Sequence, residues 1–430
     1  MAYQKAIQYL ESFINYEKIA SYPYRESCKL ERIKDFLAAI GDPQEALRCI
    51  HVAGTKGKGS TCAFISYILR EAGFRVGLYT SPHLSDFRER IRILERQNTS
   101  TSNPFEGMIT KRGLTAIVDR LKPAIDKYNK ISKYGPLSFF EVYTALAFVY
   151  FKEQQTDFVV LETGLGGRLD ATNTVNALVS VITPISYEHT DKLGSTLAEI
   201  AGEKAGIIKG DQGIRGSGDQ AIVISAPQEE EARDVIRNRC KEAGATLCQP
   251  KIRKLKIKLY GDHQQVNANV ALAAVRALKI GISGATIRRG LQNTVWPGRC
   301  EIVSKYPLVV LDGAQNVASA KAIKEAVRKN FKYKKLILIL GISKDKDIKG
   351  ICSELYDLAD EVILTRADNP RATKPEDLRS HFKNKKAYLT KSVLEAKRFA
   401  DKFAMKKDLL LVTGSLFVVG EARNAWRRKR

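Results

Sequence analysis

The sequence lacks the features that mark secreted, membrane-spanning and zinc-cluster proteins. Its seven cysteines are an odd number, scattered without a C-x-x-C pair, so they fit free thiols in a reducing cytosol better than disulfides or a zinc site. No apolar run reaches the ~20 residues that a membrane-spanning helix needs, and the first residues contain no hydrophobic region of a signal peptide. We therefore expect a cytoplasmic protein with no membrane partner.

Acidic residues are few relative to basic ones. The chain of 430 residues has 71 Lys+Arg against 47 Asp+Glu, a net charge of +24. From Arg299 onward there are 30 Lys+Arg and 16 Asp+Glu, so the last third is the more basic part. This excess could serve nucleic acid or an acidic, many-charged substrate, but a solvated lysine-rich surface explains most of it. The length suggests two domains.

The most informative stretch is a glycine-rich turn between a short apolar run and a helix-forming segment. The apolar run covers 50–53, three glycines follow within six residues, and the helical segment covers 62–71. This order aims backbone N–H groups and a helix N-terminus at phosphate oxygens. Lys58 would supply a charge to the phosphates, and Ser60 or Thr61 a hydroxyl. The Walker pattern is not met, because Val52 replaces its first glycine and Gly59 directly follows Lys58. A glycine-rich surface turn is the plainer alternative.

Apolar runs alternating with helical stretches predict an α/β fold. Continuous runs that favour buried parallel strands cover 157–162, 177–183 and 221–225. The alternating stretch 252–260 favours a half-exposed edge strand. After a hinge at 296–299, four further strands are expected at 307–312, 335–340, 361–365 and 408–413. We thus predict a P-loop doubly wound ATPase domain over 1–296, followed by a smaller Rossmann-like domain over 297–430.

Three polar residues follow strands that should end at one edge of the first sheet. Glu162 ends a buried strand, His189 lies just past the next one, and Ser81 follows the preceding one. Ligands of open α/β sheets bind at this edge. A hydroxyl, a carboxylate and an imidazole there suit Mg²⁺ on ATP phosphates, with a partly hydrated shell. For His189 alone, a hydrogen-bonded loop histidine would be the plainer interpretation.

Several long motifs resemble those of one enzyme family. The chain has GTKGKGST at 54–61, TSPHL at 80–84, ETGLGGRLDATN at 162–173 and GEKAGI at 202–207. It continues with GDHQQVNA at 261–268, WPGR at 296–299 and DGAQN at 312–316. In this order, over nearly the whole chain, these motifs resemble the folylpolyglutamate synthase/dihydrofolate synthase family, a branch of the Mur ligases.

The resemblance implies ATP, two Mg²⁺ ions and, as a further cofactor, K⁺. The metal ligands would be Ser81, Glu162 and His189. Lys204 matches the lysine that the family carbamylates with CO₂, and without the resemblance it would pass for an ordinary helix lysine. The catalytic residues would be Lys58, Lys204, His189 and Arg299. The residues that would contact ATP are Gly54, Thr55, Gly57, Lys58, Gly59, Ser60, Thr61, Asn267, Arg299 and Asp312.

The resemblance also implies a pterin-side pocket and shows two departures. Residues that match its lining are Ser138, Phe139, Phe140, Glu141, Leu169, Asp170 and Ala171. By itself, the pair Phe139–Phe140 is more often helix core. The departures are Lys56, often asparagine in bacterial members, and Gln315, where the family usually has histidine. Glutamine keeps hydrogen bonding but cannot carry charge.

The implied reaction is C–N ligation through an acyl phosphate. A folate or dihydropteroate carboxylate would attack ATP, and L-glutamate would then displace phosphate, in an enzyme expected to be a monomer without a specific nucleic-acid partner. One rival is a Mur ligase of cell-wall synthesis, since 368–371 read DNPR, although the fifty residues before the glycine-rich loop leave no room for a uridine-nucleotide domain. The other rival is a nucleic-acid-binding P-loop ATPase, motivated by the charge.

Overall fold

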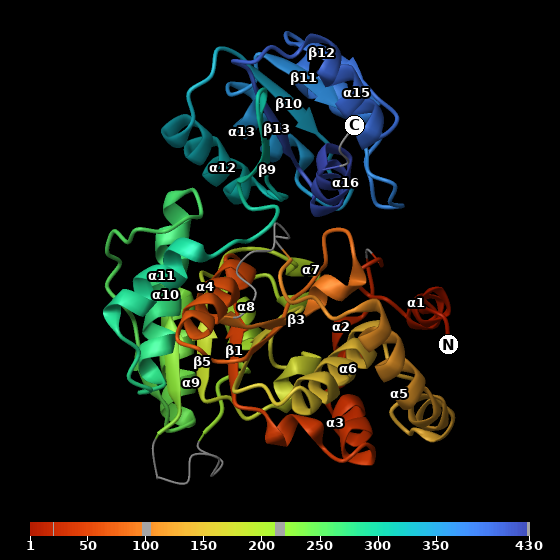
Figure 1. Cartoon of the computed structure of the whole chain (residues 1–430), viewed down its shortest axis with the longest axis vertical. Helices are drawn as coiled ribbons and strands as arrows, with labels where there is room; N and C mark the ends of the chain where they lie inside the picture. Colours follow the sequence, from red (N-terminus) through yellow and green to blue (C-terminus); the bar gives the residue numbers. More distant parts are fainter. Residues whose placement is uncertain (20, 97–104, 211–219, 428–430) are drawn as a thin grey trace. The chain divides into compact units, whose positions relative to one another are not determined.

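The computed structural model describes residues 1–19, 21–96, 105–210 and 220–427 and divides into two compact units, each built around its own sheet (Figure 1). Unit 1 comprises Met1–His83, Phe87–Lys258 and Gln264–Val295. Unit 2 comprises Leu84–Asp86, Leu259–His263 and Trp296–Arg430.

Unit 1 has a seven-stranded sheet of order β3-β2-β4-β1-β5-β6-β7. Every neighbouring pair is parallel except β2 with the edge strand β3. The strands are β1 (Cys49–Ala53), β2 (Val76–Tyr79), β3 (Ile91–Leu94), β4 (Phe158–Glu162), β5 (Val179–Ile182), β6 (Ile222–Ser225) and β7 (Thr246–Cys248). The continuous apolar runs of β4, β5 and β6 are therefore parallel strands, as their sequences predict.

Both faces of this sheet are covered. Val159 and Leu161 of β4 pack into a core with helices α1, α3, α5 and α6. The alternate residue Val160 points to the other face and is also fully buried, and α4 contacts β1, β2 and β4. The helices of this unit are α1 (Tyr3–Glu11), α2 (Tyr24–Ser27), α3 (Leu30–Ala39), α4 (Lys58–Glu71), α5 (Lys111–Ile131), α6 (Phe139–Glu153), α7 (Thr190–Leu193), α8 (Leu197–Ala205), α9 (Glu230–Glu242), α10 (Asp262–Ala277, whose first two residues fall in unit 2) and α11 (Gly284–Asn293).

Unit 2 has a six-stranded sheet of order β12-β11-β10-β13-β9-β8, parallel except for the pair β9 and β8. Alternate residues of β10 enter two different cores: Leu338 packs with α12 and α13, and Ile339 packs with α15 and α16. The strands are β8 (Glu301–Lys305), β9 (Leu308–Leu311), β10 (Leu336–Leu340), β11 (Glu361–Leu364), β12 (Lys386–Leu389) and β13 (Leu409–Thr413). The helices are α12 (Val317–Asn330), α13 (Ile348–Tyr356), α14 (Pro375–Arg379), α15 (Val393–Phe403) and α16 (Leu416–Arg427). Helices on both faces confirm the doubly wound α/β fold.

The predicted edge strand at 252–260 is wrong, because this segment has no strand pairing. Its backbone groups bond instead to side chains of α10. Asn269 accepts from Arg253 N at 3.2 Å and donates to Arg253 O at 2.8 Å. Gln265 does the same for Leu255, at 2.8 and 3.1 Å. Two amide side chains thus take the place of a neighbouring strand.

No helix within the described ranges is long and apolar enough to cross a membrane.

Candidate active site

The predicted site residues of unit 1 follow four adjacent parallel strands. In the order β2-β4-β1-β5, Ser81 follows β2, Glu162 ends β4, the glycine-rich loop follows β1 and His189 lies after β5. Parallel strands end at one edge, so these segments share the edge where open α/β sheets bind ligands.

Two glycines of the loop lie where a side chain would not fit. Gly54 has φ +144°, and a Cβ there would lie 1.9 Å from Thr183 Oγ1. Gly57 has φ +84°, precedes the first residue of α4, and a Cβ there would lie 2.1 Å from Asn267 Oδ1. The loop therefore passes tightly between β5 and α10, and Asn267 lies against it.

The loop is tied to the segment that follows β5. The backbone N–H groups of Thr55 and Lys56 both donate to Pro184 O at 3.1 Å. The Thr55 hydroxyl accepts from Ser186 N and donates to Ser186 O, both at 3.2 Å. Since α4 begins at Lys58, its first N–H groups and its partial positive charge are available to an anion at the loop.

Two lysine amines meet at one carbonyl of this loop. Lys58 Nζ donates to Gly54 O at 3.2 Å, and Lys204 Nζ donates to the same oxygen at 3.0 Å. Lys204 lies in the last turn of α8 and is 4% exposed. Burial, and next the charge of Lys58, lower the pKa of Lys204 from 10.5 to about 7. A large fraction of its amine is therefore neutral at physiological pH.

The carboxylate at the end of β4 is buried. Glu162 is 6% exposed and its Oε2 accepts from Ser81 N at 3.2 Å. Within the described part of the chain, the hydroxyl oxygens of Thr61, Thr163 and Ser186 are buried and make no hydrogen bond. Thr61 lies in the first turn of α4, Thr163 directly follows β4 and Ser186 follows β5, so all three belong to segments at the ligand-binding edge of the sheet.

His189 lies directly before α7, half-buried, with φ +54°. The described residues contain no group of three or more His, Cys, Asp or Glu side chains placed to hold a metal ion. The predicted ligands Ser81, Glu162 and His189 offer a hydroxyl, a carboxylate and an imidazole, which is a donor set that suits Mg²⁺ when water or phosphate oxygens complete the shell.

The predicted pterin-side residues meet at Gly164. Asp170 Oδ2 accepts from Gly164 N at 2.8 Å and from Leu165 N at 3.0 Å. A Cβ on Gly164 would lie 2.8 Å from the ring of Phe140. The first turn of α6 and the loop after β4 are thus in direct contact. Leu169 is half-buried beside Asp170, and Ala171 is buried.

A buried histidine supports this loop, and neither the motifs nor the resemblance indicates it. His51 Nε2 lies 2.7 Å from Thr172 Oγ1, whose hydroxyl donates to Asp170 Oδ1 at 2.5 Å. Because the threonine proton points to Asp170, His51 Nε2 donates to the threonine. Burial, and next the charge of Lys209, lower the pKa of His51 to about 3, so the ring is neutral. The only sequence signal is one histidine inside an apolar strand.

In unit 2, the two predicted ATP contacts lie side by side. Asp312, at the end of β9, accepts from Cys300 N at 2.8 Å and from Ala314 N at 2.9 Å. A Cβ on Gly313 would lie 2.5 Å from Arg299 Nη1. Burial raises the pKa of Asp312, and the charge of Arg299 opposes this shift. Gln315 is half-buried just before α12, and its N–H donates to Ser319 Oγ.

Comparisons with known proteins cover most of the chain. A family model described as the glutamate ligase domain of Mur ligases matches residues 298–416. The dihydrofolate synthase/folylpolyglutamate synthase of Bacillus subtilis is 33% identical over 428 residues, 92% of this chain and 94% of the relative.

Two solved structures extend this likeness to three dimensions. The folylpolyglutamate synthase of Mycobacterium tuberculosis complexed with ADP has a TM-score of 0.86 at 28% identity, covering 99% of this chain and 98% of its own. A bifunctional folylpolyglutamate synthase/dihydrofolate synthase with Mn, AMPPNP and L-glutamate bound has a TM-score of 0.80 at 29% identity, covering 99% and 98%. The chain therefore belongs to the folylpolyglutamate synthase/dihydrofolate synthase family of Mur-type ligases.

Proposed function

We propose that this enzyme uses ATP to join L-glutamate to the carboxylate of a folate or of dihydropteroate. It is an ATP-dependent acid–amino-acid ligase, as its family membership implies. The observation that carries the site assignment is the pair of amines, Lys58 and Lys204, that meet at the Gly54 carbonyl. A loop with open N–H groups beside the cation of Lys58 suits a polyphosphate.

The first step forms an acyl phosphate on the acceptor. The acceptor carboxylate attacks the γ-phosphorus of ATP, a P–O bond forms, and the bond to ADP breaks. Lys58 and the N-terminus of α4 stabilise the charge that develops on the phosphate oxygens. We assign the other ATP contacts of this unit to Gly54, Thr55, Gly57, Gly59, Ser60, Thr61 and Asn267.

In the second step, the amine of L-glutamate attacks the acyl carbon and phosphate leaves, so that an amide forms and a proton is released. The active site must exclude water, because water would hydrolyse the acyl phosphate. In unit 2 we propose that Arg299 stabilises charge on the phosphates and that Asp312 contacts the nucleotide. We also propose a glutamate-ligase domain over 297–430 that follows an ATP-binding domain over 1–296.

We assign the divalent metal to Ser81, Glu162 and His189. The hydrogen bond between Ser81 N and Glu162 holds two of these residues together. When bound, Mg²⁺ would neutralise charge on the phosphate oxygens. His189 would hold its ion as a neutral imidazole.

Lys204 is proposed to carry a carbamate. Its neutral amine adds to CO₂, so that a C–N bond forms and a proton leaves, and the buried cation becomes an anion suited to a second Mg²⁺. The pKa of about 7 supports this reaction, since only the neutral amine is a nucleophile. Mass spectrometry of the native protein in bicarbonate should find 44 Da (the mass of CO₂) added to the wild type and not to Lys204→Arg.

We assign the acceptor pocket to Ser138, Phe139, Phe140, Glu141, Leu169, Asp170 and Ala171. Phe140 and Leu169 have exposed surface, whereas Glu141 and Asp170 accept hydrogen bonds within the protein. The latter two therefore shape the pocket rather than reach a ligand. We further propose a K⁺ requirement, a monomer, and a cytoplasmic location, which the seven free thiols support.

The decisive experiment measures ADP release with ATP, Mg²⁺, K⁺ and L-glutamate, comparing dihydropteroate with tetrahydrofolate. Turnover that requires one of these acceptors and L-glutamate is expected. A muramyl-peptide acceptor is the matched control, because 368–371 read DNPR. Turnover with that acceptor alone, or ADP release that depends on an oligonucleotide, would contradict the proposal.

A further inference from the structure

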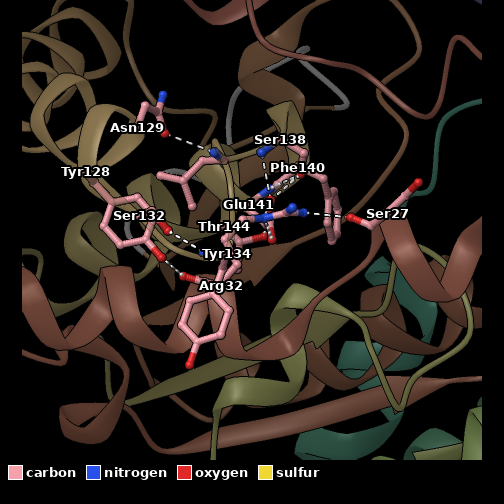
Figure 2. Close-up of polar contacts among 11 residues, drawn as sticks. Ser27, Arg32, Tyr128, Asn129, Ser132, Tyr134, Ser138, Phe140, Glu141 and Thr144 are labelled. Atoms are coloured by element: carbon pink, nitrogen blue, oxygen red, sulfur yellow. Dashed lines mark hydrogen bonds and ion pairs between the residues drawn. The ribbon is translucent and has the colours of Figure 1, made fainter.

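A buried ion pair joins two helices beside the proposed acceptor pocket. Arg32 lies on α3 and Glu141 in the first turn of α6, and they are 6% and 5% exposed. Arg32 Nε lies 2.9 Å from Glu141 Oε1 and 3.0 Å from Oε2. Arg32 Nη2 also donates to Ser27 O at 2.8 Å (Figure 2). One guanidinium thus ties α6 to the chain that leads from α2 to α3.

The same carboxylate caps α6. Glu141 Oε2 accepts from Ser138 N and from Ser138 Oγ, both at 2.7 Å, while Glu141 N donates to Ser138 Oγ at 3.4 Å. This is a capping box, which satisfies N–H groups at the start of the helix. A glutamine at 141 would still cap the helix, but it could not form an ion pair with Arg32. The two interactions are therefore separable by mutation.

Helix α5 holds both sides of this cluster. Tyr128 donates its hydroxyl to Arg32 O at 2.8 Å, and Asn129 Oδ1 accepts from Leu137 N at 2.9 Å, one residue before the cap. Figure 2 shows Tyr128 and Asn129 on the same side of the cluster, with Arg32 and Glu141 in its middle. Helix α5 thus contacts both the backbone of α3, at Arg32, and the backbone that enters α6, at Leu137.

Phe140 lies directly before Glu141 in the first turn of α6. Ser138, Phe139 and Glu141 are buried, and Phe140 alone of residues 138–141 is half-buried. Its ring lies so close to Gly164 that a Cβ there would be 2.8 Å from it. Tyr79, whose ring centroid is 6.0 Å away, lies beside the same ring. A small shift of the first turn of α6 would move Phe140 relative to Gly164.

A buried ion pair is a poor way to gain stability, because desolvation offsets most of the attraction. The guanidinium and the carboxylate, however, form two parallel hydrogen bonds only within a narrow range of relative orientations. We infer that Arg32 is a positioning residue for acceptor binding: through Glu141 it holds the first turn of α6 so that Phe140 forms one wall of the pocket. This inference rests on the proposed function, and it assigns to Arg32 no contact with any substrate.

The test uses the full chain and compares acceptor KM with ATP KM. Glu141→Gln keeps the cap and removes the ion pair, and Arg32→Met combined with Glu141→Gln leaves no unpaired buried charge. Both variants are expected to raise acceptor KM about tenfold or more, because a shift of Phe140 would weaken its contact with the acceptor, with ATP KM within about twofold of wild type. Arg32→Lys keeps the positive charge but loses the planar guanidinium that bonds to both carboxylate oxygens. Its acceptor KM should therefore lie between those of the wild type and the double variant.

The matched control is Glu71→Gln at the end of α4. Glu71 is 6% exposed, pairs with Arg70 at 2.5 Å and accepts from Asn293. It lies about 20 Å along the helix from the glycine-rich loop. Its loss should lower thermal stability without changing acceptor KM. Circular dichroism at the assay temperature confirms that each variant is folded.

Three outcomes would overturn the inference: a folded double variant with wild-type acceptor KM, an equal rise in acceptor and ATP KM, or an equal rise in acceptor KM in Glu71→Gln. Absence of acceptor-dependent turnover in the wild type would instead contradict the proposed function itself. The two failures are thus distinguishable in one set of assays.

Discussion

Lys204 offers a sharp test, because its amine is buried next to another cation. Its pKa of about 7 lies far below the 10.5 of an exposed lysine. That gap corresponds to about 5 kcal/mol of penalty for keeping Lys204 charged in the folded state. At low pH both the folded and the unfolded chain hold this proton, so the whole penalty is present.

The sign of the pH dependence follows from proton binding. Between the folded pKa of about 7 and the unfolded value of 10.5, the unfolded chain holds more protons, so wild-type stability rises with pH. From pH 6 to pH 9 the penalty falls by about 3 kcal/mol. Lys204→Met has no such proton. The unfolding free energy of the variant minus that of the wild type should therefore fall by about 3 kcal/mol over this range.

Urea denaturation followed by circular dichroism, in buffer freed of CO₂, measures this difference at each pH. Because all other titrating groups are shared, they cancel in the comparison. A difference that is constant from pH 6 to pH 9 would refute the assignment of a depressed lysine. Adding bicarbonate at pH 8 should stabilise the wild type alone, since carbamate forms in the folded state.

Three further predictions concern the rest of unit 1. Lys58→Met should lower the rate of ADP release about 10²- to 10³-fold without loss of folding. A smaller effect would contradict the proposal that Lys58 stabilises charge on the phosphates. Gly164→Ala should raise acceptor KM and leave ATP KM unchanged, because the new Cβ would lie 2.8 Å from the Phe140 ring. An unchanged acceptor KM would contradict the assignment of Phe140 to a wall of the acceptor pocket. For His51, with a folded pKa of about 3 against an ordinary 6.5, the unfolded chain gains its proton first as the pH falls. Wild-type stability should thus drop by about 2 kcal/mol relative to His51→Gln between pH 6.5 and 4.5, and parallel urea curves would argue against a buried neutral ring.

Much of the fold could be predicted from apolar runs alone. The run at 335–340 became β10, with all five of its strand residues buried. Edge strands are harder to predict from apolar runs, because they are short and half-exposed. Lys386–Leu389 forms β12 with no fully buried residue, and its apolar run is only three residues long, 387–389. At 252–260 the alternating pattern was real, but its partners were the side chains of Gln265 and Asn269, which no strand pattern reveals.

The candidate site was predictable where motifs are local and not where contacts are distant in sequence. The glycine-rich loop is contiguous, so its shape follows from its own residues. The depressed pKa of Lys204 depends on burial and on Lys58, 146 positions away in the chain. The pair Arg32–Glu141 spans 109 positions. The spacing Ser138-x-x-Glu141 does predict a capping box, but only packing places an arginine against it.

Each sheet buries its own side chains: the cores described for β4 and for β10 share no residue. Folding can therefore be cooperative within a sheet without being cooperative over the whole chain. In a calorimeter, the van't Hoff enthalpy should then be smaller than the measured heat. A nucleotide that binds the glycine-rich loop would shift to higher temperature the transition of the sheet that carries this loop, so the scan itself would identify which transition belongs to unit 1.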